Sequence, residues 1–262
     1  MTTHGSTARH AATNSPEEGA SGRGFHEELL AATAGERDYL MARPLIRRAL
    51  AGELDLSEYR AFLAQAYHHV RHTLSLLMAC GAQLSAPDFV FREGLRRAIA
   101  EYIEEENGHE HWILDDLEAL GVAREAASRR LPLHATEMMV AYAYDAIARR
   151  HPLCMFGMVL VLEGTSTRAA TQAGIAIRDS LALDDSAFHY LFSHGELDVS
   201  HMAFFAELMN TIDCPREQAH IVHAARAFYR LYAEVLDAAL ADAPAWTDRA
   251  MEIGPNHRHT RP

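Results

Sequence analysis

The sequence has few cysteines and no long uninterrupted apolar run. Its 262 residues include three cysteines, Cys80, Cys154 and Cys214, and no CxxC pair. Three cysteines are too few for a disulfide framework, which fits a reducing compartment. No apolar stretch reaches the length that a membrane span needs, and the first residues lack the apolar core of a signal peptide. We therefore expect a cytoplasmic protein.

Positive charge is also scarce. The chain has 36 acidic and 24 basic residues, which gives a formal net charge of −12. Nucleic acid or an anionic membrane surface would be repelled overall, and no local basic patch stands out. We therefore expect a small-molecule substrate, with no nucleic-acid partner and no membrane partner. The sequence leaves open whether the protein forms a homodimer.

The residues that are abundant, namely Ala, Leu, Glu and Arg, favour helices. Apolar segments with a period of 3.6 alternate with short breaks at Gly, Pro, Asp or Ser, and no β-branched alternation is long enough for a sheet. The pattern predicts an all-α protein of about seven helices. We expect one helical domain over residues 25–250, with disordered tails at 1–24 and 251–262.

One predicted helix, over roughly residues 186–209, carries two imidazoles and a carboxylate on one face. His194, Asp198 and His201 are spaced four and three residues apart. The same stripe is otherwise apolar: Leu191, Met202, Phe205 and Met209. Burial of such polar groups costs several kcal/mol each unless they are paired or bind a metal. We interpret the three as metal ligands; satisfied core residues or a stripe tilted toward solvent are the alternatives.

A second helix, beginning near Leu153, is buried nearly all round. Every residue from Met155 to Leu162 is apolar or glycine, and Glu163 follows. A carboxylate in that setting needs a cation, which is either a metal or an arginine such as Arg168.

A third helix, predicted over residues 91–120, offers a cluster of acidic and histidine side chains. Glu106 and His109 lie centrally on its apolar stripe, with Glu105 at the edge. Their E-x-x-H spacing lets a carboxylate and an imidazole share a metal pair in helical bundles. A π-bulge would bring in Glu105 instead. Two side chains project to the solvent side of this helix: Glu104 and His111.

A fourth helix, predicted over residues 57–80, carries His68, His69 and His72. Only His69 lies near the inner edge of the apolar stripe, and there it could orient a ligand carboxylate. All three are expected either at the surface or just behind the ligands.

The candidate ligands are three carboxylates and three imidazoles: Glu106, Glu163, Asp198, His109, His194 and His201. This mixed set without thiolate suits iron or manganese better than structural zinc. Two divalent ions carry four positive charges and three carboxylates carry three negative charges. The remaining positive charge suits a bridging oxygen species or an anionic substrate. We expect two metal ions with open positions, redox chemistry with O₂, and a catalytic role for the three carboxylates.

Three segments, EENGHEHWILDDLEALG, PLCMFGMVLVLEGTS and HGELDVSH, resemble the haem-oxygenase-like diiron oxidases and oxygenases, also called iron-containing redox enzymes. The resemblance covers most of residues 25–245. It implies the seven-helix, single-domain bundle shared with haem oxygenase, thiaminase II and the PQQ-synthesis oxidase. It also implies that the six residues above are the ligands, with Glu105 or Glu106 as the first of them.

The same resemblance implies two Fe(II) ions, O₂ as cosubstrate, and a small carboxylate-bearing substrate such as an amino acid or a fatty acid. Oxidative C–C cleavage or N-oxygenation would be the outcome. One alternative is a cofactor-independent enzyme like thiaminase II or the PQQ oxidase, with Glu163 as acid or base and Cys154 as nucleophile. Another is a non-enzymatic ferritin-like iron-binding bundle. The expected pocket residues are Tyr102, Met158, Leu162 and Phe205, with Arg168 as carboxylate anchor.

Overall fold

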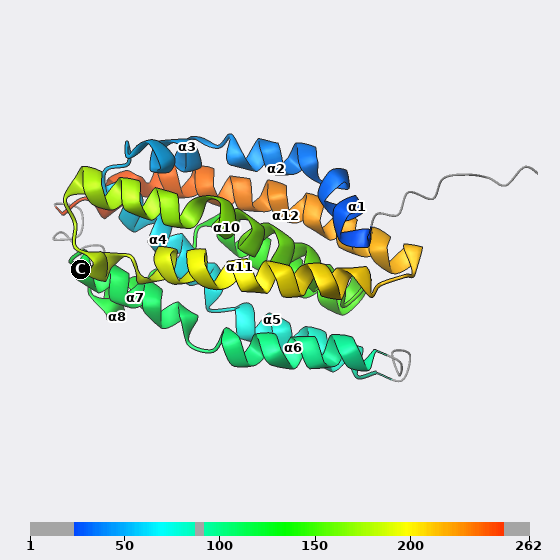
Figure 1. Cartoon of the computed structure of the whole chain (residues 1–262). Helices are drawn as coiled ribbons and strands as arrows, with labels where there is room; N and C mark the ends of the chain where they lie inside the picture. Colours follow the sequence, from blue (N-terminus) through cyan, green and yellow to red (C-terminus); the bar gives the residue numbers. More distant parts are fainter. Residues whose placement is uncertain (1–23, 87–91, 249–262) are drawn as a thin grey trace, which may run out of the picture.

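The computed structural model describes residues 24–86 and 92–248, without the side chains of residues 196–200. Every regular element in these ranges is helical, and no strand occurs within them (Figure 1). This confirms the predicted all-α class. No helix of the described part is long and apolar enough to cross a membrane. The predicted tails lie outside the described residues, apart from Gly24.

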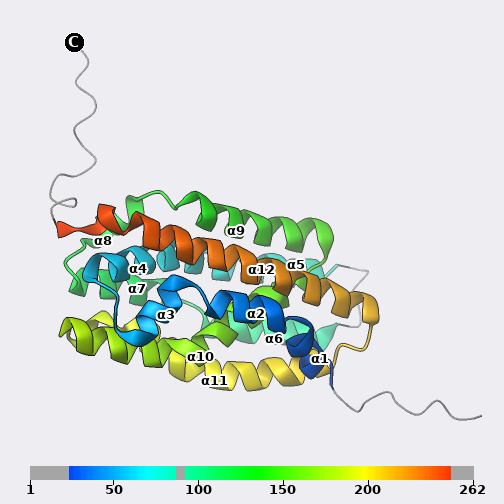
Figure 2. The same ribbon diagram turned by 90° about the horizontal axis from the view of Figure 1, so that it is seen from above.

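Three long helices form the centre of the bundle. They are α10 (Cys154–Leu181), α11 (His189–Asn210) and α12 (Pro215–Asp242), and α10 packs against both of the others (Figures 1 and 2). Gly157 permits the close approach of α10 to α12, because a Cβ there would lie 2.6 Å from the backbone nitrogen of Ala225. The glycine within the apolar run of α10 is therefore a packing requirement.

Shorter helices surround these three. Helices α1 (Phe25–Ala32), α2 (Ala34–Met41) and α3 (Pro44–Ala51) cover α10, α11 and α12 on one side (Figure 1). Helix α4 (Leu56–Val70) packs on α12, α7 and α9, whereas α5 and α6 pack on each other. The remaining helices are α5 (Thr73–Leu84), α6 (Glu93–Glu105), α7 (His109–Ala119), α8 (Arg124–Arg129) and α9 (His134–Asp145).

Two helices that the sequence predicted as continuous are broken, so the described part holds more than seven helical segments. The helix predicted over residues 57–80 is interrupted at Arg71 and His72. No glycine or proline marks this break. The helix predicted over residues 91–120 is interrupted between Glu105 and His109, where Gly108 adopts a left-handed conformation with φ of 96°. This is a backbone conformation that glycine adopts without strain.

Helix α4 begins at Leu56 because of a capping box. The Asp55 carboxylate accepts from the backbone N–H of Glu58, and the Glu58 carboxylate accepts from the backbone N–H of Asp55. Arg48 of α3 donates to both oxygens of Glu58 and so joins α3 to α4. The start of α4 is thereby fixed, about three and a half turns before its buried histidines.

His68 on α4 gives the fold a predictable sensitivity to acid. It is buried, and burial lowers its pKa to about 4, with the charges of Arg71, His72 and Arg130 acting in the same direction. In the unfolded chain the pKa of His68 is near 6.5. Between pH 6.5 and pH 4 the unfolded chain therefore binds a proton at His68 and the folded chain does not. The contribution of His68 to stability is complete above pH 6.5 and is lost as the pH falls toward 4.

We expect the unfolding free energy of iron-free protein to fall between pH 6.5 and pH 4, with His68 contributing on the order of 2 kcal/mol. Urea unfolding of the wild type and of His68→Gln at several pH values measures this. The stability gap between the two proteins should narrow as the pH falls. A gap that stays constant would show that His68 does not titrate in this way.

Candidate metal centre

The structure brings five of the six predicted ligands together. Two groups of three form, and in each the ligand atoms all lie within 4.8 Å of one another. One group is Glu106, His109 and His194, and the other is Glu106, Glu163 and His201. Glu106 belongs to both. The arrangement therefore offers two adjacent three-ligand sites that share one carboxylate.

The sixth predicted ligand, Asp198, lies on α11 between His194 and His201. Its side chain is outside the described residues. Its role as a ligand stays a prediction.

The break between α6 and α7 places Glu106 and His109 in the cluster. Glu106 directly follows α6 and begins the turn over residues 106–108, and His109 is the first residue of α7. Oε2 of Glu106 lies 3.1 Å from Nδ1 of His109, and both side chains are buried. Burial alone would raise the pKa of Glu106, but the neighbouring imidazoles hold it below its ordinary value. Glu106 is thus a carboxylate, the form that binds metal ions.

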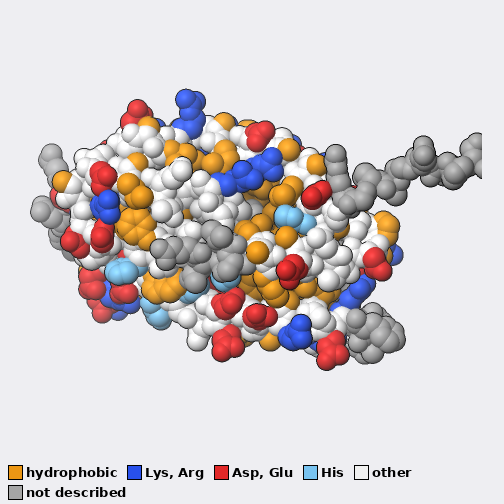
Figure 3. Space-filling view, viewed as in Figure 1, with side chains coloured by type: hydrophobic (Ala, Val, Ile, Leu, Met, Phe, Trp, Pro, Cys, Tyr) orange, Lys and Arg blue, Asp and Glu red, His pale blue; other side chains and the backbone are white. Residues whose placement is uncertain are grey.

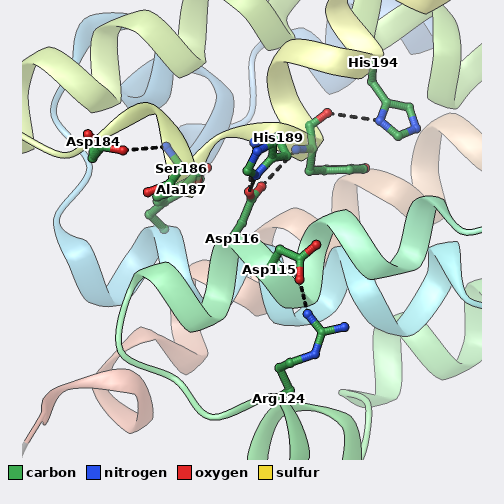
Figure 4. A network of polar contacts seen from close by, with 10 residues as sticks. Asp115, Asp116, Arg124, Asp184, Ser186, Ala187, His189 and His194 are labelled. Carbon is green, nitrogen blue, oxygen red and sulfur yellow. Dashed lines mark hydrogen bonds and ion pairs between the residues drawn. The ribbon is translucent and has the colours of Figure 1, made fainter.

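His194 presents a defined nitrogen to the cluster. Its Nδ1 donates to the backbone carbonyl of Tyr190 at 3.0 Å, one turn earlier on α11 (Figure 4). Because the carbonyl can only accept, the neutral ring carries its lone pair on Nε2. Backbone hydrogen bonds of this kind orient histidine ligands in metal sites.

Asp116 connects the two helices that carry His109 and His194, and sequence reasoning missed it. This residue of α7 is fully buried (0% exposed), and its carboxylate accepts from the backbone N–H groups of His189 and Tyr190 at 2.8 and 2.9 Å (Figure 4). Nδ1 of His189 lies 3.2 Å from the same carboxylate. Burial raises the pKa of Asp116 to about 6, against the effect of these contacts. The carboxylate therefore caps the N-terminus of α11 and fixes it to α7.

Glu105 and Glu106, which the sequence left as alternatives, both lie at the cluster, but they differ in exposure. Glu106 is buried at its centre, whereas the Glu105 side chain is 43% exposed at its rim, with Oε2 3.1 Å from Nε2 of His201. Figure 3 shows acidic side chains gathered over α6, where Glu101 and Glu104 are also exposed. This acidic rim would attract cations to the cluster.

His68 and His69, on helix α4, are both buried. His69 is 2% exposed, and burial lowers its pKa to about 3, with His194 and the neighbouring histidines adding to the shift. His68 is buried as well, which removes the surface alternative for this residue. Side chains outside the main apolar stripe of α4 are also buried, because α7, α9 and α12 all pack against this helix.

Contrary to the prediction from the sequence, Arg168 is not placed to anchor a substrate carboxylate. It is exposed and lines neither of the cavities near the cluster. Glu163 instead faces His201, with Oε1 4.0 Å from Nδ1. Of the predicted pocket residues, Tyr102, Met158 and Leu162 line the cavity beside the cluster, whereas Phe205 packs in the core.

Cys154 is not placed to act as a nucleophile with Glu163. Burial raises the pKa of its thiol to about 11, although the thiolate is the reactive form. It also lies nine residues before Glu163 on α10, about 14 Å along the helix axis. The geometry gives no support to this alternative.

Comparison with known proteins agrees with the fold and with iron chemistry. The family model described as iron-containing redox enzyme matches residues 60–233. No curated protein matches the sequence.

Among solved structures, a domain with a haem oxygenase-like fold from Shewanella denitrificans aligns with a TM-score of 0.75 and 21% identity, covering 90% of this chain and 98% of that one. A TenA homologue from Pseudomonas syringae aligns with a TM-score of 0.71 and 12% identity, covering 87% and 97%. The haem oxygenase of Leptospira interrogans aligns with a TM-score of 0.64 and 14% identity, covering 82% and 100%. At these identities the likeness shows the fold, which is haem oxygenase-like.

Proposed function

The chain belongs to the iron-containing redox enzymes, and from this premise we propose that it is a non-haem oxidase or oxygenase that uses two Fe(II) ions and O₂. The observation that carries the proposal is the shared position of Glu106 in two ligand groups. Carboxylates commonly bridge metal pairs in helical bundles. Bound Fe(II) would supply the electrons for O₂ reduction and open coordination positions.

The donor set fits iron. The described ligands are two carboxylates, Glu106 and Glu163, and three imidazoles, all hard or borderline donors. Cys80 and Cys154 are buried in the core and belong to neither ligand group. Asp198 would complete the set, and it would bring the number of ligand carboxylates to three.

The protein's own residues would then hold and orient the metal pair. Glu106 would join the two sites, Glu163 and His201 would complete one of them, and His194 would be held by its bond to Tyr190. Glu106, Glu163 and Asp198 are the proposed catalytic carboxylates. We propose a small molecule as the partner, and neither nucleic acid nor a membrane. Light scattering tests whether the protein is a monomer or a homodimer.

Oxygen consumption by iron-loaded protein tests this function. Protein loaded anaerobically with Fe(II) should consume O₂ and oxidise at least one member of a panel of fatty acids and amino acids. Zinc-loaded protein is the control, because zinc has no redox chemistry. Equal O₂ consumption by the iron and zinc forms, or bound iron without any substrate oxidation across a broad panel, would contradict the proposal.

Two polar residues beside the cluster should be dispensable for iron binding. Glu104 is exposed on α6, and the His111 side chain is 63% exposed. We expect Glu104→Gln and His111→Gln to bind Fe(II) with affinities within about tenfold of the wild type, that is within about 1.4 kcal/mol. Competition against a chromogenic chelator measures this. A larger loss in either variant would place that residue among the ligands.

A further inference from the structure

His201 on α11 lies between two glutamates and presents a different ring nitrogen to each. Its Nε2 lies 3.1 Å from Oε2 of Glu105, and its Nδ1 lies 4.0 Å from Oε1 of Glu163. The first distance is that of a hydrogen bond, whereas the second is too long for one. One nitrogen of the imidazole is therefore turned to the exposed Glu105, and the other is turned to the buried Glu163.

The contact with Glu105 determines which nitrogen of His201 is available to a metal ion. A carboxylate can only accept a hydrogen bond, so in the neutral imidazole the proton lies on Nε2. The lone pair is then on Nδ1, the nitrogen that faces Glu163. Because Glu163 and His201 belong to the same ligand group, a metal ion in that group would be bound by Nδ1 of His201.

His194, about two turns earlier on the same helix, is held the other way round. Its Nδ1 donates to the backbone carbonyl of Tyr190, so its lone pair is on Nε2 (Figure 4). The two histidines of α11 therefore present opposite ring nitrogens to the two ligand groups. The hydrogen-bond acceptor of His194 lies on its own helix, whereas that of His201 comes from α6.

The last turn of α6 contacts His201 at two points. Tyr102 and Glu105 are three residues apart and so lie on one face of this helix. The buried Tyr102 ring packs edge-on against the His201 imidazole, with the centroids 6.1 Å apart and the planes at 72°. Glu105 approaches the same imidazole from the rim, and neither ligand group includes it. The next residue, Glu106, is the carboxylate that both groups share.

We propose that Glu105 is a positioning residue of the metal centre: its carboxylate orients His201 so that Nδ1 binds one of the two metal ions, and Glu105 itself is not a ligand. A carboxylate that accepts from a histidine ligand fixes the ring and raises the basicity of the nitrogen that binds the metal. This role rests on the metal pair of the proposed function, and not on the oxidation chemistry. It gives different roles to Glu105 and Glu106, which the sequence left as alternatives.

The affinity for Fe(II) in variants with one remaining site tests this role. His109→Ala should keep only the site of Glu163 and His201, and Glu163→Ala only the site of His109 and His194. Added to His109→Ala, Glu105→Ala should weaken the remaining site about 10- to 100-fold, the usual cost of losing a partner that orients a ligand. Added to Glu163→Ala, it should change the affinity less than about fivefold, as for one exposed charge. Anaerobic competition with a chromogenic chelator measures both.

Glu104 gives the matched control. It precedes Glu105 on α6 and is also exposed, so Glu104→Ala removes a carboxylate from the rim and keeps the contact with His201. It should change the affinity less than about fivefold in both backgrounds. Glu105→Gln should fall between Glu105→Ala and its parent, because the amide oxygen still accepts from Nε2. Alanine suits a helix and the Glu105 side chain is 43% exposed, so the variants should keep the wild-type circular dichroism.

Nuclear magnetic resonance identifies the ring nitrogens directly. Zinc is the metal for this measurement, because it is closed-shell and has no redox chemistry. In zinc-loaded protein with isotope-labelled histidine, long-range proton–nitrogen correlations should place the proton of His201 on Nε2 and that of His194 on Nδ1. Glu105→Ala should remove this preference from His201 and leave His194 unchanged.

A proton on Nδ1 of His201 would overturn the role of Glu105. Equal effects of Glu105→Ala in the two single-site backgrounds, or equal effects of Glu104→Ala and Glu105→Ala, would do the same. A loss well beyond a hundredfold in the His109→Ala background would make Glu105 a ligand, which also contradicts the proposal. Wild-type protein that binds two metal ions and oxidises no substrate would refute the proposed function and leave the role of Glu105 standing, whereas wild-type protein that binds no metal would overturn both.

Discussion

Glu106→Ala should abolish both iron sites at once. Glu106 is the only described residue that belongs to both ligand groups, and its carboxylate is buried between them. Loss even of a residue that orients a ligand lowers metal affinity about 10- to 100-fold, so loss of a shared ligand should exceed a hundredfold at each site. Anaerobic titration with Fe(II), followed by gel filtration and metal analysis, should find close to no retained iron and no O₂-dependent activity.

Single-site variants provide the matched comparison. His109→Ala and Glu163→Ala each remove a ligand from only one group and should each retain about one Fe(II) per chain. Glu163→Ala should leave the iron-free fold intact, because it removes a buried carboxylate. Equal iron loss in all three variants would contradict the shared role of Glu106, as would retention of one iron by Glu106→Ala.

Asp116→Ala should be strongly destabilising, by about 3 kcal/mol. It removes the acceptor for two backbone N–H groups at the start of α11, and each lost hydrogen bond to a charged acceptor costs about 1.5–3 kcal/mol. It also removes a negative charge from the N-terminus of that helix. Urea unfolding of iron-free protein measures the change.

The neighbouring aspartate is the control. Asp115 is 49% exposed, and its ion pair with Arg124 lies at the surface (Figure 4). Asp115→Ala should therefore change the unfolding free energy by less than about 1 kcal/mol. Asp116→Asn keeps one acceptor oxygen and should fall between the two. If Asp115→Ala and Asp116→Ala proved equally mild, α11 would not depend on this cap.

The sequence predicted which residues meet at the cluster better than it predicted the helices that carry them. Projection on a straight helix put Glu106 and His109 on the inner face, and they do lie together, but through a break at Gly108 that the projection did not contain. Across the turn at residues 106–108, Oε2 of Glu106 still lies 3.1 Å from Nδ1 of His109. Periodicity therefore selected two residues that do meet at the cluster, although the helix it assumed is broken between them.

Features that depend on contacts between two or more helices could not be predicted from the sequence. Asp116 stands in the apolar stripe of α7, but its partners are the backbone N–H groups of another helix, which no side-chain pattern reveals. The cavity between α3, α4, α10, α11 and α12 likewise depends on several elements, because small residues of α10 such as Ala169 and Ala173 leave space there that the other helices do not fill. The same dependence on neighbours explains the buried His68.

The most direct test of the two-iron centre is anaerobic titration of the iron-free protein with Fe(II), with Mössbauer spectroscopy on the end point. The shared carboxylate of Glu106 predicts saturation at two Fe(II) per chain, with a spectrum of high-spin Fe(II) whose signal is lost from both sites in Glu106→Ala. Saturation at one Fe(II) per chain, with no second site at any concentration, would contradict the account.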